Sequence, residues 1–199
     1  MNKNLQKLKE EFGKFGSWAL WEKDGSLKIN RQNFQSLIKP NIMFVGLNAS
    51  FDLRTVDDWS NYHVIKNKKG SSWRKEHCRK LAEVLSDPQF SFFSGAYMTD
   101  IIKNDYSSSS SKVKNIIDQK NKQLFLREIK LLSSISASDK FIVICIGDKS
   151  FEMVKAIGIF KDDIFKVRHY SSRGTHNELK KKMGADLLKV VGITNFKTL

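Results

Sequence analysis

Short apolar segments alternate with longer amphipathic segments along this chain. Apolar runs of about four to eight residues that stop at a turn-forming residue are typical of strands buried on both faces of a sheet. The first run, residues 42–45, stops at Gly46 and is followed by Asn48, which favours a tight turn. The same pattern predicts further strands at residues 96–100, 141–146 and 164–167.

Helical periodicity marks the segments before, between and after these strands. Apolar residues recur at helical spacings in residues 4–15, 72–85, 118–135 and from 175 onward. Thr175 and Glu178 have the spacing of a capping box, which predicts the start of the last helix. This alternation predicts an α/β fold, a three-layer α/β/α sandwich with a central, mostly parallel sheet of about four strands.

The chain length predicts one domain over residues 1–199, with the helix and aromatic segment of residues 1–40 packed on it. No apolar run approaches the roughly 20 residues of a membrane span, and residues 1–11 are too polar for a signal peptide. Cys78 and Cys145 are too few for a disulfide scaffold or a four-cysteine metal site. We therefore expect a monomeric, cytoplasmic protein with no membrane contact, no metal and no cofactor.

The net charge of +14 is large for a chain of this size. Such a field attracts polyanions and indicates a nucleic acid as partner. The long polar stretch at residues 51–70 carries Lys66, Lys68 and Lys69, which we expect to contact phosphate groups. The alternative is that lysine-rich solvated faces alone account for the charge.

Polar residues follow three of the predicted strands directly. Asn48, Asp100 and His169 stand at or just beyond the ends of residues 42–45, 96–100 and 164–167. In open α/β sheets, ligands bind beyond the carboxyl ends of the strands, so these side chains are candidates for one cleft. Each also has an ordinary explanation as a turn or capping residue.

Three motifs at these strand ends resemble those of the uracil-DNA glycosylase superfamily, in its mismatch-specific branch. Residues 46–50, Gly-Leu-Asn-Ala-Ser, look like the motif Gly-Ile/Leu-Asn-Pro-Gly. Residues 97–100, Tyr-Met-Thr-Asp, look like Tyr-Ile-Thr-Asn, and residues 169–171, His-Tyr-Ser, look like His-Pro-Ser. The chain departs from these motifs at Ala49 and Ser50, at Asp100 and at Tyr170. The resemblance extends over roughly residues 42–188 and implies a four-stranded parallel sandwich.

The implied activity is hydrolysis of the N-glycosidic bond of a base flipped out of DNA, and the identity of that base stays open. Such a reaction builds negative charge on the leaving base, after the base has left the stack. By this resemblance Asn48 and His169 are the catalytic residues. The carbonyl oxygen of Asn48 is suited to orienting the attacking water, and His169 to donating a hydrogen bond to the base oxygen.

The resemblance also assigns binding residues. Tyr62 corresponds to an aromatic residue that stacks on the flipped base, and Asp100 to the asparagine that recognises it, so we expect Tyr62, Asp100 and Phe51 to line the base site. An ionised Asp offers only acceptors, which predicts a base preference different from that for uracil. Ser171 and Arg173, with the loop around them, are expected to hold DNA phosphate.

Two other functions fit the same residues. One is a non-catalytic nucleic-acid-binding or sensing protein on this scaffold, which the departures at Asp100 and at Ala49 and Ser50 favour. The other is an α/β enzyme that acts on a free nucleotide or another phosphorylated small molecule. Excision of damaged bases from duplex DNA separates the glycosylase from both.

Overall fold

The computed structural model describes most of the chain. The described residues are 2–22, 25–28, 34–49, 57–63, 80–103, 105–107, 112–113, 116–136, 138, 140–160, 163–170, 172 and 175–197. Every structural statement below concerns these residues.

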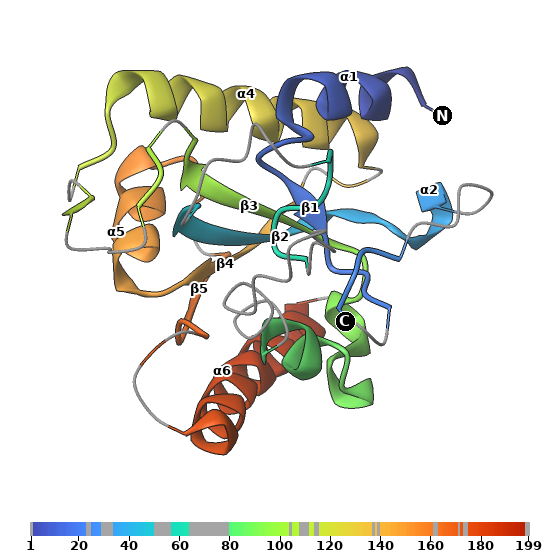
Figure 1. Cartoon of the computed structure of the whole chain (residues 1–199), viewed down its shortest axis with the longest axis vertical. Helices are drawn as coiled ribbons and strands as arrows, with labels where there is room; N and C mark the ends of the chain where they lie inside the picture. The colour runs from blue at the N-terminus through green and yellow to red at the C-terminus, as the bar shows by residue number, and fades with distance from the viewer. Residues whose placement is uncertain are drawn as a thin grey trace, which may run out of the picture.

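A five-stranded mixed sheet forms the centre of the molecule (Figure 1). Its strands are β1 (Ser17–Trp18), β2 (Lys39–Asn48), β3 (Ala96–Ile102), β4 (Ile142–Ile146) and β5 (Ile164–Val167), in the order β1-β3-β2-β4-β5. The last four strands in this order are parallel, whereas β1 runs antiparallel to β3. All four predicted strands are therefore present, and the expected sheet of about four strands gains a short fifth strand at its edge.

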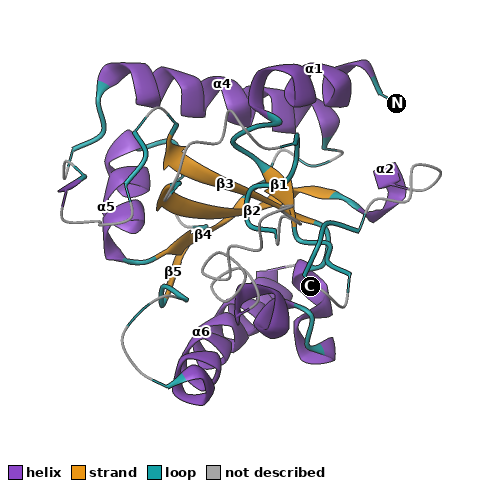
Figure 2. Cartoon of the chain, viewed as in Figure 1, coloured by secondary structure: helices purple, strands orange, loops and turns teal. Residues whose placement is uncertain are grey.

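Helices cover both faces of this sheet (Figure 2). On one face lie α1 (Lys3–Phe12), α4 (Gln119–Ile135) and α5 (Asp148–Ile157). The other face is covered by α6 (His176–Lys197), by the 3₁₀ helix η2 (Pro88–Phe93) and by a helical segment described over residues 80–85. A short helix, α2 (Phe34–Leu37), precedes β2. Within the part of the chain that the structure describes, no helix has the length and apolarity needed to cross a membrane.

Side chains of β2 enter the two layers of the core alternately. Met43 and Val45 pack in the cluster under α1, α4 and α5, whereas Ile42 and Phe44 pack in the cluster under α6 and η2. Successive strand residues point to opposite faces, so a strand covered on both faces needs an unbroken apolar run. Cys145 lies buried within β4 as a free thiol, and burial raises its pKa to about 12.

The capping box predicted at the start of α6 is present. The Glu178 carboxylate accepts a hydrogen bond from the backbone N–H of Thr175 at 2.9 Å, and the Glu178 N–H donates to Thr175 Oγ1 at 3.3 Å. These reciprocal bonds satisfy backbone donors that a helix start would otherwise leave without partners. The box fixes where the chain leaves the loop after β5 and enters α6.

Candidate functional site

The carboxyl ends of the parallel strands meet at one edge of the sheet. Gly46 of β2 stands opposite Asp100 of β3, and Ile146 of β4 stands opposite Val167 of β5. Asn48 ends β2 and His169 lies two residues beyond β5, and we call this edge of the sheet the carboxyl edge. The sequence pattern placed the end of its second strand at Asp100, but β3 continues to Ile102, so Asp100 lies two residues before the strand end. The other predicted contacts lie outside the described residues: Phe51, Lys66, Lys68, Lys69, Ser171 and Arg173.

The Asn48 side chain is fixed by backbone carbonyls. Its Nδ2 donates to the carbonyl oxygens of Ala49 at 3.0 Å, Asp105 at 3.3 Å and Ser107 at 3.1 Å. These acceptors determine which end of the amide is the NH₂ group and join β2 to the segment after β3. The amide is half-buried, and its carbonyl oxygen is the hydrogen-bond acceptor of the side chain.

Asp100 is buried, with both carboxylate oxygens hydrogen-bonded within the protein. Tyr62 Oη donates to Asp100 Oδ1 at 2.5 Å and Asn61 Nδ2 donates to Asp100 Oδ2 at 3.1 Å. Burial raises the pKa of Asp100, and the two donors oppose that rise because they stabilise the charged form. Burial, together with the neighbouring Asp100 and Tyr170, raises the pKa of Tyr62 well above its usual value.

Tyr62 lies in a turn, residues 57–63, that contains two left-handed backbone conformations. Trp59 has a φ of 64° and Tyr62 a φ of 68°, values uncommon for residues with bulky side chains. The phenol of Tyr62 lies over Gly46, since a Cβ at Gly46 would stand only 2.3 Å from both Tyr62 Oη and Asp100 Oδ1. Only glycine fits at this point of β2.

An aromatic pair lies beside these residues at the end of β5. The rings of His169 and Tyr170 are stacked, with centroids 4.5 Å apart and an interplanar angle of 24°. His169 lies next to Gly147, where a Cβ would be 3.6 Å from His169 Cβ. Gly147 has a φ of 94°, which favours glycine and lets β4 turn directly into α5. Both rings are half-buried.

The structure adds a buried ion pair that sequence reasoning missed. Lys103 Nζ donates to Glu128 Oε2 at 2.6 Å, to Thr99 Oγ1 at 2.5 Å and to the Asp100 carbonyl oxygen at 2.5 Å. Tyr97 Oη donates to Glu128 Oε1 at 2.7 Å. The Lys103 and Glu128 side chains are fully buried. The network ties the carboxyl end of β3 to α4, and no periodicity in the sequence points to it.

His63 is a buried neutral histidine at the end of the same turn. Burial lowers its pKa to about 4, against the opposing effect of its hydrogen bond to the Trp18 carbonyl. Its Nε2 lies 3.1 Å from that carbonyl oxygen, and its ring lies 5.3 Å from the Trp21 ring. The residue anchors the turn on β1 and does not face the carboxyl edge as a ligand.

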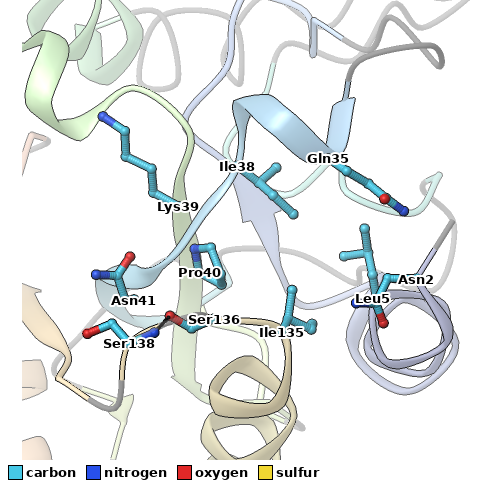
Figure 3. Close-up of a pocket in the computed structure, with 10 residues that line it drawn as sticks. All are labelled: Asn2, Leu5, Gln35, Ile38, Lys39, Pro40, Asn41, Ile135, Ser136 and Ser138. Atoms are coloured by element: carbon cyan, nitrogen blue, oxygen red, sulfur yellow. Dashed lines mark hydrogen bonds between the residues drawn. The ribbon is translucent and has the colours of Figure 1, made fainter.

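A pocket of about 440 Å³ lies at the opposite, amino end of β2 (Figure 3). Polar and apolar residues line it, among them Gln35, Asn41, Ser136 and one basic residue, Lys39. The Lys39 ammonium points away from these side chains and is bound by the carbonyl oxygens of Ser91 and Phe92. This pocket is separate from the carboxyl edge and shares none of its residues.

Among the described residues, no three His, Cys, Asp or Glu side chains gather closely enough to hold a metal ion. What the edge offers is an oriented amide, an aromatic pair and a buried carboxylate that anchors a tyrosine. Comparison of the chain with protein-family models, with curated proteins and with solved structures yields no match.

Proposed function

We propose that this protein hydrolyses the N-glycosidic bond of a base flipped out of DNA. The observation that carries the proposal is the fixed Asn48 amide at the carboxyl end of β2, whose Nδ2 is held by three carbonyl oxygens. A preorganised acceptor is what orients an attacking water without taking its proton. The aromatic pair at the end of β5 supports the proposal, because a base out of the stack needs a flat apolar surface.

Asn48, at the end of β2, acts on the attacking water, and His169, beyond the end of β5, acts on the leaving base. The oxygen of a water held by Asn48 bonds to the anomeric carbon of the sugar, and the electron pair of the breaking C–N bond leaves with the base. His169 donates a hydrogen bond to the oxygen on which that negative charge develops. The water loses a proton and the base gains one, so the products are a neutral base and an abasic sugar.

Removing the Asn48 amide is expected to lower the single-turnover excision rate by about 100-fold, because one preorganised hydrogen bond in the transition state is lost. The measurement compares Asn48→Ala with wild type on duplexes that carry different damaged bases. Affinity for the duplex is expected to change little, since it comes mainly from phosphate contacts elsewhere.

Asn41→Ala is the matched control, because Asn41 is also a half-buried asparagine of β2 but lines the pocket at the amino end. It is expected to keep the wild-type rate. Thermal melts of both variants separate a catalytic loss from a folding defect. A wild-type protein that excises no base from any duplex would rule out the glycosylase activity.

A non-catalytic nucleic-acid-binding protein is the second candidate, and the burial of the Asp100 carboxylate, with a protein donor on each oxygen, favours it. A base can meet this carboxylate only if the side chains that cover it move. The net charge of +14 supports DNA binding under both functions.

DNA binding is expected to weaken with salt under either function. The logarithm of affinity should fall with the logarithm of salt concentration by about 0.9 for each phosphate neutralised in duplex DNA. Exposed lysines near the start of α6 are candidates for these contacts: Lys180, Lys181 and Lys182. Replacing all three with alanine is expected to reduce the slope in a titration of fluorescent duplex across a salt series.

The matched control removes three exposed lysines from the opposite face of the sheet, Lys3, Lys7 and Lys130. Both variants lose the same charge, so a difference in slope reports where the DNA lies. No binding at low salt, or a flat salt response of the wild type, would show that the basicity is only compositional.

A further inference from the structure

We infer that Asp100 is a positioning residue that fixes Tyr62 over Gly46, and that the site accepts bases by stacking and not through hydrogen bonds to Asp100. The inference rests on the proposed function, because it specifies the substrate class of the same site. It differs from the expectation that the resemblance gave, in which Asp100 recognises the base directly.

Each carboxylate oxygen of Asp100 already accepts a hydrogen bond from the protein. Asp100 Oδ1 accepts from Tyr62 Oη at 2.5 Å, Oδ2 accepts from Asn61 Nδ2 at 3.1 Å, and the residue is only 5% exposed. Tyr62 is also 5% exposed. Because both side chains are buried, a base edge could meet the carboxylate only if the Tyr62 phenol or another covering group moved, and a buried donor or acceptor that loses its partner is costly.

The anchoring of the turn around Tyr62 is the second argument. The Trp59 N–H donates to the Gly13 carbonyl at 2.6 Å, Ser17 Oγ donates to the Trp59 carbonyl at 2.6 Å, and Asn61 Nδ2 donates to the Phe15 carbonyl at 2.8 Å. Left-handed conformations of bulky residues persist only where the surroundings fix them. Tyr62 is therefore fixed behind the site and is not a gate that swings aside.

The stacked pair of His169 and Tyr170 is what remains for contact with a base. Its rings are half-buried, in contrast to the buried Asp100 and Tyr62. Stacking tolerates every base, because every base has a π-face, whereas hydrogen-bonded edges discriminate. The substrate class is therefore flipped bases that carry an oxygen for His169, purines and pyrimidines alike, with no preference set at position 100.

The first test replaces the carboxylate with its amide. Asp100→Asn keeps an acceptor for Tyr62 Oη but presents an NH₂ group to the NH₂ group of Asn61. Single-turnover rates on duplexes with uracil, hypoxanthine or another excised base are expected to fall by a common factor of about 10 to 100 through misplacement of Tyr62. Duplex affinity stays unchanged, and Asp148→Asn, an exposed aspartate at the start of α5, keeps the wild-type rates.

A change of base preference decides against the inference. If Asp100→Asn raises the rate on uracil relative to the other bases by tenfold or more, Asp100 recognises the base and is not a positioning residue. The inference is also overturned if the rate of Asp100→Asn falls only in proportion to the amount of folded protein, as measured by thermal melts.

The second test does not depend on activity. Melting temperatures of Asp100→Ala, Tyr62→Phe and the double variant form a double-mutant cycle. Each single variant is expected to melt roughly 5 °C or more below wild type, and the double variant little lower than the less stable single variant, because both substitutions remove the hydrogen bond between Tyr62 Oη and Asp100 Oδ1. Additive losses would show that the two residues are uncoupled and overturn the inference. If the wild type excises no base, the proposed function fails while this cycle still decides whether Asp100 positions Tyr62.

Discussion

Replacing Lys103 with methionine is expected to lower the free energy of unfolding by about 3 to 5 kcal/mol, the cost of leaving one partner of a buried ion pair alone. The Glu128 carboxylate is fully buried and would lose the Lys103 ammonium, which lies 2.6 Å away. Thr99 and the Asp100 carbonyl would lose the same donor. Urea unfolding followed by circular dichroism measures the loss.

Lys130→Met is the control, since Lys130 is exposed on α4, the helix that carries Glu128. It is expected to change the free energy of unfolding by less than about 0.5 kcal/mol. The double variant Lys103→Met with Glu128→Leu should recover part of the loss, because no uncompensated charge is then buried. A loss below about 1 kcal/mol for Lys103→Met alone would contradict the role assigned to the pair.

Gly46→Ala is expected to destabilise the protein by at least 1 to 3 kcal/mol, roughly the cost of overpacking a filled core. The new methyl group would stand 2.3 Å from both Asp100 Oδ1 and Tyr62 Oη, so the Tyr62 turn or the end of β2 must move. Under the proposed function the same variant loses excision activity. Urea unfolding and the single-turnover assay measure the two effects.

Gly192→Ala is the control for this substitution. Gly192 lies in α6 with no atom within 4 Å of the added Cβ, so alanine is expected to stabilise the protein by roughly 0.5 to 1 kcal/mol through its higher helix propensity. Equal effects of the two substitutions would mean that the contact of Gly46 with Tyr62 and Asp100 does not constrain the site.

Strand positions were predictable because burial on both faces leaves a simple pattern. The apolar run at residues 42–45 lies within β2, and the run at residues 164–167 coincides with β5. The two-residue strand β1 was not predicted, because Ser17 and Trp18 are too few to show any periodicity. The capping box at α6 was predictable because both of its partners lie within one turn of helix.

For the candidate site, the sequence predicted only which strands carry polar residues near their carboxyl ends. Strand ends indicated that Asn48, Asp100 and His169 would share an edge, since parallel strands in register end together. The partners of these residues could not be predicted, because periodicity gives the face of a strand and not the distant residue that packs there. Tyr62 forms a hydrogen bond with Asp100, which lies 38 positions further along the chain. Nothing in the sequence indicates that this tyrosine adopts a left-handed φ.

The two outer strands of the sheet, β1 and β5, limit the association of one molecule with another through the sheet. In the part of the chain that the structure describes, β1 pairs only with β3, and β5 pairs only with β4. These border strands are two and four residues long, and β5 carries the exposed Lys166. A second molecule adding a strand at either border would gain few backbone hydrogen bonds and, at β5, would have to accommodate that charge. The sheet is thereby protected against growth from one molecule to the next, the first step of fibrous aggregation.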